Sequence, residues 1–277
     1  MTNLVVWKRP AISLQHITDN RRDEFFIEGT NRPSIWVIAD TRVTDPSKIT
    51  DQATKILELD ATTYKKIEGH GYQSMWNLSI GFAYAGAVFP AMMTYAALKV
   101  LLSNLAPGEA RLPTLQQIAN LTAYIAEQYV RDGKKAFGEF PHCHIVLTGM
   151  SGYDGELAAM LVAPKEEYPD FQYKSRVLDL DVVHVFGDKV KELKAAIQHL
   201  QDEADETRLG LEPKIALELR IAAAESSKVG GTLQYGVHDG KFKAYAVNDS
   251  KKNLFLGFDL NAVAKQIGFD ILLDGLM

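Results

Sequence analysis

The first two residues, Met1 and Thr2, suggest the most specific chemistry in this sequence. A small second residue permits removal of the initiator methionine, which leaves a threonine with both a hydroxyl and a free α-amine. An α-amine has a pKa of about 8, so it can act as a general base at neutral pH. An N-terminal threonine therefore carries its own base, and it is a known variant of the catalytic nucleophile. Thr2 is the candidate nucleophile, and Asp40, Arg42 and Lys55 are the charged residues that could support it.

Other catalytic and metal-binding patterns fail. The run from Gly149 to Tyr153 nearly matches a nucleophile elbow, but its last glycine is replaced by Tyr153, so a hairpin turn is favoured. His142 and His144 flank Cys143 on one face of an expected strand and have no third ligand nearby, which favours ordinary strand residues over a metal site. We therefore expect no metal and no cofactor.

Composition excludes several classes of protein. The 277 residues include 30 Lys and Arg against 35 Asp and Glu, a net charge of −5 that argues against a nucleic-acid binder. One cysteine excludes an intramolecular disulfide, a four-cysteine zinc site and an iron–sulfur cluster held by this chain alone. Only Leu4–Trp7 is apolar near the start, which is too short for a secretory signal, so we expect a cytoplasmic protein.

The segment from Gly69 to Leu98 contains no Asp, Glu, Lys or Arg. Leu78–Leu98 is long enough to span a bilayer, which keeps a membrane helix as an alternative. The favoured interpretation is a buried strand at Met75–Ala83 that leads into a buried helix at Pro90–Leu102, with proline in the first turn. We therefore expect no membrane span.

The order of the expected elements indicates the fold class. Four strands precede two helices, two or three strands follow, and then come two helices and two strands. Hairpin-linked strands with paired helices predict an α+β protein, a four-layer αββα sandwich with two antiparallel sheets, and a single domain over residues 1–277. The expected strands are Leu4–Trp7, Ile35–Ala39, Lys55–Leu59, Met75–Ala83, His144–Thr148, Leu157–Val162, Val182–Phe186, Thr232–Val237 and Phe242–Val247, and the helices are Pro90–Leu105, Thr114–Arg131, Val190–Gln201 and Pro213–Ala224.

Several of these segments together resemble proteasome β-type subunits. The run from Ser34 to Thr44, with Ala39-Asp40-Thr41-Arg42, is similar to their second strand and the turn after it. The run from Ala53 to Leu59 resembles the segment with the active-site lysine, and Asp40 and Lys55 are 55 − 40 = 15 positions apart, close to the family spacing. Similar matches occur at Ile80–Gly86, Val146–Gly155 and Lys228–Thr232.

The resemblance is to N-terminal-nucleophile hydrolases of the proteasome, HslV-like and Anbu-like type, and it implies a role for each site residue. Thr2 would attack a carbonyl carbon. Lys55 would lower the proton affinity of the nucleophile, and Asp40 would hold Lys55. A backbone N–H at the glycine turn, assigned to Gly86, would stabilise the oxyanion. For Asp40 and Lys55 the alternative is a structural ion pair at a strand end.

The sequence also departs from the family pattern. Thr2 and Asp40 are 38 positions apart, so residues 11–31 would be an insertion, and residues 250–277 would be a C-terminal extension. The first strand could instead be Glu24–Glu28. The family has a serine in a Gly-Ser-Gly turn where this chain has Phe186-Gly187-Asp188, and Ser227 is the candidate substitute.

Two functions follow from the resemblance. The first is an N-terminal-threonine hydrolase that cleaves peptide or small amide substrates, a threonine-type peptidase or amidohydrolase without cofactor. The second is a catalytically silent subunit of the same fold with a structural or binding role in a ring. Both predict a closed homo-oligomer, which the uncharged segment and the apolar first helix also favour, with the ring size and any unfoldase partner left open.

Overall fold

The computed structural model describes residues 3–10, 33–45, 47–106, 111–151, 155–165, 171–203, 210–223, 228–249, 252–255, 258–267 and 275–276. The insertion expected at residues 11–31 and the alternative first strand Glu24–Glu28 lie outside this range. The chain divides into two compact units. The first contains Met1–Ile56, Asp181–Asp239 and Ala244–Met277, and the second contains Leu57–Leu180 and Gly240–Lys243.

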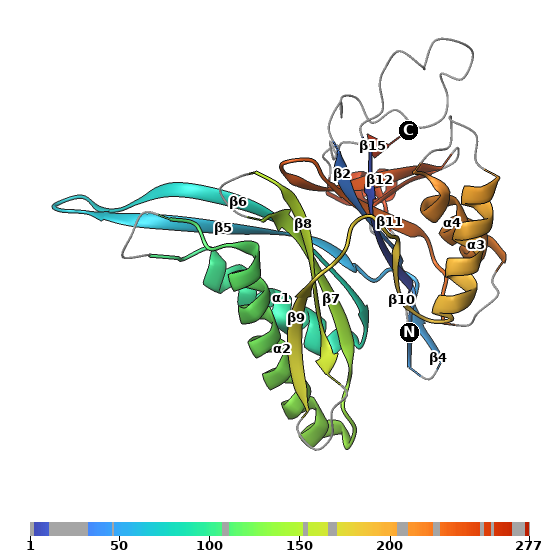
Figure 1. Cartoon of the computed structure of the whole chain (residues 1–277), viewed down its shortest axis with the longest axis horizontal. Helices are drawn as coiled ribbons and strands as arrows, with labels where there is room; N and C mark the ends of the chain where they lie inside the picture. Colours follow the sequence, from blue (N-terminus) through green and yellow to red (C-terminus); the bar gives the residue numbers. More distant parts are fainter. Residues whose placement is uncertain are drawn as a thin grey trace, which may run out of the picture. The chain divides into compact units, whose positions relative to one another are not determined.

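The main sheet of the first unit has the strand order β10-β1-β2-β11-β12-β13-β14, and β15 pairs with β12 (Figure 1). β1 lies antiparallel between β10 and β2, and β2 lies antiparallel to β11. The strands are β1 (Asn3–Arg9), β2 (Ser34–Asp40), β10 (His184–Gly187), β11 (Leu233–His238), β12 (Phe242–Asp249), β13 (Lys252–Phe255), β14 (Phe258–Asp259) and β15 (Gly275–Leu276), with a separate hairpin of β3 (Val43–Asp45) and β4 (Ser47–Thr50).

Helices α3 (Val190–Asp202) and α4 (Glu212–Ala223) pack on this sheet, and α5 (Leu260–Ile267) follows β14. Leu193 and Ile197, one turn apart on α3, join a core with Leu217 of α4. Trp36 and Tyr235 belong to the same core and stack with ring centroids 6.2 Å apart. Every residue of β2 is buried, and so are the first five residues of β1. Burial on both faces explains why the two strands have near-continuous apolar runs.

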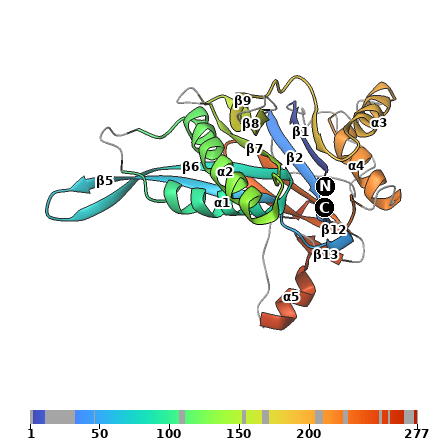
Figure 2. The ribbon, with the colours of Figure 1, turned by 90° about the horizontal axis from the view of Figure 1, so that it is seen from below.

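The second unit is a five-stranded sheet with the order β5-β6-β7-β8-β9. Helices α1 and α2 pack against each other and against this sheet (Figure 2). Thr114 caps α2 in a capping box with Gln117, and Gly138 ends the helix in the left-handed conformation. The elements are β5 (Ile56–Ile67), β6 (Gly71–Gly86), α1 (Val88–Leu102), α2 (Leu115–Phe137), β7 (Cys143–Met150), β8 (Leu157–Lys165) and β9 (Gln172–Val177).

These elements confirm the α+β class with antiparallel sheets, and each unit has a helix pair packed on its sheet. The membrane alternative for Leu78–Leu98 is wrong, because this segment divides between β6 and α1. Among the described residues, no helix is both long and apolar enough to cross a membrane. The sequence did not predict β9 or the length of the β5–β6 hairpin, and part of the expected extension 250–277 forms β13, β14, α5 and β15.

Candidate active site

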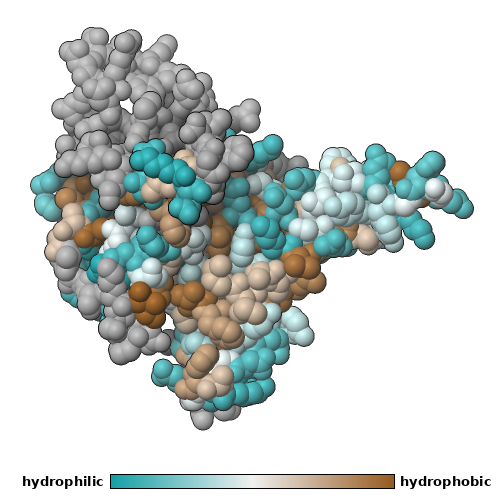
Figure 3. Space-filling model, turned by 180° about the vertical axis from the view of Figure 1, so that it is seen from behind, coloured by the Kyte–Doolittle hydropathy of each residue, from teal (hydrophilic) through white to brown (hydrophobic). Residues whose placement is uncertain are grey.

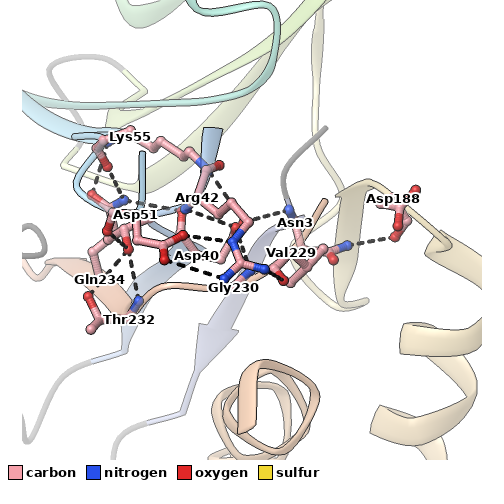
Figure 4. A network of polar contacts seen from close by, with 12 residues as sticks. Asn3, Asp40, Arg42, Asp51, Lys55, Asp188, Val229, Gly230, Thr232 and Gln234 are labelled. Carbon is pink, nitrogen blue, oxygen red and sulfur yellow. Dashed lines mark hydrogen bonds and ion pairs between the residues drawn. The ribbon is translucent and has the colours of Figure 1, made fainter. Parts of the chain in front are cut away.

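Asp40 ends β2 and has no solvent exposure. Its carboxylate accepts three backbone hydrogen bonds, because three chain segments end or turn beside it. Asn3, the first described residue of β1, donates to Oδ1 at 2.8 Å. Arg42 and Gly230 each donate to Oδ2 at 3.2 Å (Figure 4). The carboxylate therefore fixes the end of β1 against the turn that follows β2.

Lys55 lies at the same place and is also fully buried. Its Nζ is 3.5 Å from Asp40 Oδ1 and donates a hydrogen bond to the carbonyl oxygen of Arg42. The structure thus brings together the two charged residues that the sequence placed in one site. A buried lysine needs such partners, because an uncompensated charge away from water is very costly.

The two charges act on each other's protonation. Burial lowers the pKa of Lys55 to about 8, although the neighbouring Asp40 carboxylate acts to raise it. Burial raises the pKa of the Asp40 carboxyl, while Lys55 and the three backbone N–H groups favour its ionised form. With a pKa of about 8, Lys55 remains mostly protonated at neutral pH and loses its charge at a lower pH than a free lysine.

Gln234 on β11 is a site residue that sequence reasoning missed. Its Oε1 accepts the backbone N–H of Lys55 at 3.0 Å and that of Ile56 at 3.3 Å. Its Nε2 donates to the carbonyl oxygens of Asp40 at 3.4 Å and Ala53 at 3.0 Å. One buried amide therefore holds the lysine segment beside the end of β2. A polar residue in an otherwise apolar strand, between Leu233 and Tyr235, was the signal that could have revealed it.

Arg42 links the turn after β2 to two neighbouring segments of the first unit. Its guanidinium forms a two-point contact with Asp51, with Nε 2.7 Å from Oδ1 and the second nitrogen 3.4 Å from Oδ2. It also donates to the carbonyl oxygen of Val229 at 3.2 Å. A Cβ on Gly230 would lie 2.4 Å from the guanidinium carbon, so a larger residue there would displace Arg42 from these contacts. Arg42 thereby positions the carbonyl that binds Lys55.

Gly86 lies in the second unit, at the end of β6, where it pairs with Cys143 on β7. Its φ is +107°, and an added Cβ would lie 2.6 Å from the carbonyl oxygen of His142. Glycine is therefore required at this turn, and α1 begins two residues later at Val88. The assignment of an oxyanion donor to Gly86 remains a prediction.

Thr2 lies outside the described residues, and so does Ser227. Phe186-Gly187-Asp188 contributes backbone contacts, because Gly187 lies opposite Asn3 and the carbonyl oxygen of Asp188 accepts the Asn3 side chain at 2.8 Å. Within the part of the chain that the structure describes, no group of His, Cys, Asp and Glu could hold a metal ion.

No family model matches the sequence, and no curated protein matches it either. Solved structures do match. Anbu (ancestral β-subunit) from Yersinia bercovieri has 12% sequence identity and a TM-score of 0.53, covering 87% of this chain and 86% of that one. The helical Anbu assembly from Pseudomonas aeruginosa has 13% identity and a TM-score of 0.53, covering 96% and 92%.

A Gly-1 mutant of Anbu from Hyphomicrobium sp. strain MC1 is similar to the same degree, with 12% identity, a TM-score of 0.52, and coverage of 97% of this chain and 95% of that one. At such low identity the likeness establishes the fold, and the roles of individual residues must rest on their own geometry. The structural neighbours of this chain are thus Anbu proteins, and it has their proteasome-like fold as a divergent example.

Proposed function

We propose that this protein is an N-terminal-threonine hydrolase that cleaves peptide or amide bonds, with Thr2 as the nucleophile. The observation that carries the proposal is the hydrogen bond from Asn3 N to Asp40 Oδ1, 2.8 Å long. That nitrogen belongs to the peptide bond between Thr2 and Asn3. Asn3, the residue covalently bonded to Thr2, therefore contacts a buried carboxylate that also contacts Lys55.

The chemistry needs the initiator methionine to be removed. The free α-amine of Thr2 would then accept the hydroxyl proton as the oxygen attacks the substrate carbonyl carbon, and the amine would return a proton to the leaving group. Water would hydrolyse the resulting ester and regenerate the threonine. The positive charge of Lys55 would lower the proton affinity of the hydroxyl, and Asp40 would hold the lysine in place.

Two further parts of the proposal come from the family resemblance. The backbone N–H at Gly86 would stabilise the tetrahedral oxyanion, and one such donor is typically worth about 3–4 kcal/mol. The two sheets would stack in the four-layer αββα order, with the chain forming one domain. Support for both is the shared fold and the turn at Gly86, where φ is +107°. The proposed place of action is the cytoplasm.

Self-association belongs to the same proposal. Apolar side chains lie exposed on α1, which contains a single charged residue, Lys99. Exposed apolar surface of this kind marks an interface in many proteins. One Anbu structure is of a helical assembly, and we propose a homo-oligomer here. The exposed large apolar residues of α1 are Phe89, Met93, Val100 and Leu101.

A second candidate function is a catalytically silent subunit. One observation favours it: the Asp40–Lys55 pair sits in a network with Arg42, Asp51 and Gln234 that joins several strand ends. Such a network stabilises the fold whether or not it performs chemistry. The pair alone therefore does not separate the two functions, and the state of the N-terminus does.

The test is intact mass spectrometry before and after incubation with a threonine-directed electrophile. A hydrolase loses Met1 and gains one adduct per chain, while a silent subunit keeps Met1 or forms no adduct. Thr2→Ala must abolish labelling and keep the circular dichroism spectrum, since only the small side chain beyond Cβ is removed. Equal labelling of the processed wild type and Thr2→Ala would refute the proposal.

A matched pair of variants separates chemistry from folding. Lys55→Met removes the charge and keeps much of the side-chain volume, so the hydrolase proposal expects labelling to be lost. Arg42→Lys keeps a cation beside Asp51 but loses the two-point contact, so it should lower stability more than it lowers labelling of the folded protein.

A further inference from the structure

The hairpin of β5 and β6 extends beyond its sheet as an arm, residues 65–77 (Figures 1 and 2). Every residue of the arm except Ile67 is exposed. β7 pairs with β6 only from Gly81 to Gly86, so among the described residues no strand pairs with Gly71–Asn77 on that side. An isolated two-stranded ribbon is marginally stable in water, which makes a partner for the arm worth seeking.

The two edges of the arm differ. On the β5 side, Leu105 exchanges backbone hydrogen bonds with Thr62 and Tyr64, and the strand continues into Lys65 and Lys66. Lysines and other charges at an edge are the usual protection against pairing with another chain. On the β6 side, Gly71–Asn77 contains no charged residue, no proline and no described strand beside it. In the part of the chain that the structure describes, the β6 edge therefore meets the conditions for β-strand addition.

The exposed side chains of β6 are large. Tyr72 is 65% exposed, Trp76 is 52% exposed and Met75 is 40% exposed. Side chains alternate along a strand, so Tyr72, Ser74 and Trp76 lie on one face and Gln73 and Met75 on the other. Figure 3 shows the arm from behind as a free projection whose surface is mostly pale or hydrophilic.

From these features we propose that the β6 edge of the arm pairs with the same edge of a second copy of this chain, antiparallel, across a two-fold axis at Ser74. In such a contact each residue meets a residue of the identical strand, so any charge on the edge would face or approach itself. The segment that forms this edge is uncharged. Tyr72 of one copy lies opposite Trp76 of the other, twice, and aromatic cross-strand pairs are among the favourable ones.

Charge balance also selects a second copy over a peptide of another protein. A charged ligand would be matched by opposite charges on the edge, and this edge has none. The proposal goes beyond the hydrolase function, because the arm contact would form whether or not Thr2 is active.

Disulfide trapping of the full-length chain tests the contact. In the proposed contact the two copies of residue 74 are paired, with their Cα atoms about 4.5–5.5 Å apart. The two thiols of Ser74→Cys are then within reach of a disulfide. Mild oxidation at micromolar concentration is expected to give a covalent dimer on a non-reducing gel. The native Cys143 is buried and gives no background. Lys66→Cys, in the other strand of the same arm, is the matched control and is expected to give little dimer.

Mixing two variants tests the register. Gln73 of one copy lies opposite Met75 of the other, so an equimolar mixture of Gln73→Cys and Met75→Cys is expected to crosslink more than either variant alone. Equal crosslinking of Ser74→Cys and Lys66→Cys, or none in either, would overturn the proposal. A peptide or other protein as the natural occupant would give that second result.

A charge variant provides an independent readout. Ser74→Lys puts two ammonium groups at the two-fold axis, and Ser74→Thr keeps the position neutral. Sedimentation velocity is expected to show a smaller species for Ser74→Lys and the wild-type species for Ser74→Thr, with the circular dichroism of both unchanged because Ser74 is exposed. An unchanged sedimentation coefficient for Ser74→Lys contradicts the contact.

Discussion

The stability losses from removing Asp40 alone and Lys55 alone should add up to more than the loss from removing both residues together. The separation of 3.5 Å gives an attraction of about 5 kcal/mol at an effective dielectric constant of about 20. Neither side chain is exposed to solvent, so water screens this attraction little. Breaking one partner of a buried pair typically costs about 3–5 kcal/mol, because the remaining charge stays buried without compensation.

The structure ranks the two single variants. In Asp40→Asn, the Lys55 ammonium keeps its hydrogen bond to the Arg42 carbonyl oxygen but loses its carboxylate partner. The new side chain has one acceptor oxygen in place of two, so an NH₂ group can face backbone N–H groups that need an acceptor. Lys55→Met leaves the carboxylate with its three backbone donors, including Asn3. We therefore expect Asp40→Asn to be the more damaging change, at about 4 kcal/mol or more, and Lys55→Met to cost about 2–3 kcal/mol.

Urea denaturation of the wild type, both single variants and the double variant measures the coupling. The double variant Asp40→Asn/Lys55→Met leaves no buried charge without a partner. Its loss of unfolding free energy should therefore be smaller than the sum of the two single losses by at least about 2 kcal/mol. Gln198→Ala, on an exposed face of α3, is the control for handling and should change stability by less than about 0.5 kcal/mol. Additive single losses would show that the two charges do not stabilise each other and would refute the reasoning.

Three further predictions concern pH, a glycine turn and a helix cap. The pKa of Lys55 is about 8 in the fold and about 10.4 in the unfolded chain, so the unfolded chain binds more protons between these pH values. The unfolding free energy of the wild type relative to Lys55→Met should therefore rise by about 3 kcal/mol from pH 8 to 10.4 in urea titrations. A difference that stays constant over this pH range would contradict the prediction. Gly231→Ala should cost at least about 2 kcal/mol in thermal unfolding, because φ is +79° and the new Cβ would lie 2.2 Å from Thr41 Oγ1, whereas Gly69→Ala, also at positive φ but with open space, should cost less. Thr114→Ala should cost about 1 kcal/mol by loss of the capping box, and Thr114→Ser should restore most of it, which calorimetry can measure.

Local patterns in the sequence predicted much of the fold correctly. The apolar run Ile35–Ala39 became β2, and the apolar spacing after Thr114 became α2, because burial on both faces and the helical period each leave a clear pattern. The outer part of the β5–β6 hairpin was not predicted as strand before Met75, and Met75–Asn77, which we expected in a buried strand, is exposed. Its arm is solvated on both faces, so no alternation of apolar and polar residues marks its length.

The candidate site shows the same limit at the level of single residues. Asp40 and Lys55 were found because their segments and their spacing resemble those of proteasome β-type subunits, and the structure places them side by side. Gln234 was missed because its role depends on contacts with Lys55 and Ala53, which are 179 and 181 positions away in sequence. The backbone donors of Asn3 and Gly230 carry no residue-type signal at all, since any residue except proline has an N–H group.

The contacts of Asp40 extend beyond its ion pair with Lys55. A buried ion pair is weak evidence for stability, since well-packed apolar residues often serve as well or better. Here the carboxylate also receives a backbone N–H from each of three separate segments, at Asn3, Arg42 and Gly230. Only one of those segments, at Asn3, lies beside a residue that can become a nucleophile with its own base. Under the hydrolase proposal, Asp40 has a use that an apolar replacement could not supply, and the labelling of Thr2 in Asp40→Asn, compared at equal folded fraction with the wild type, measures that use directly.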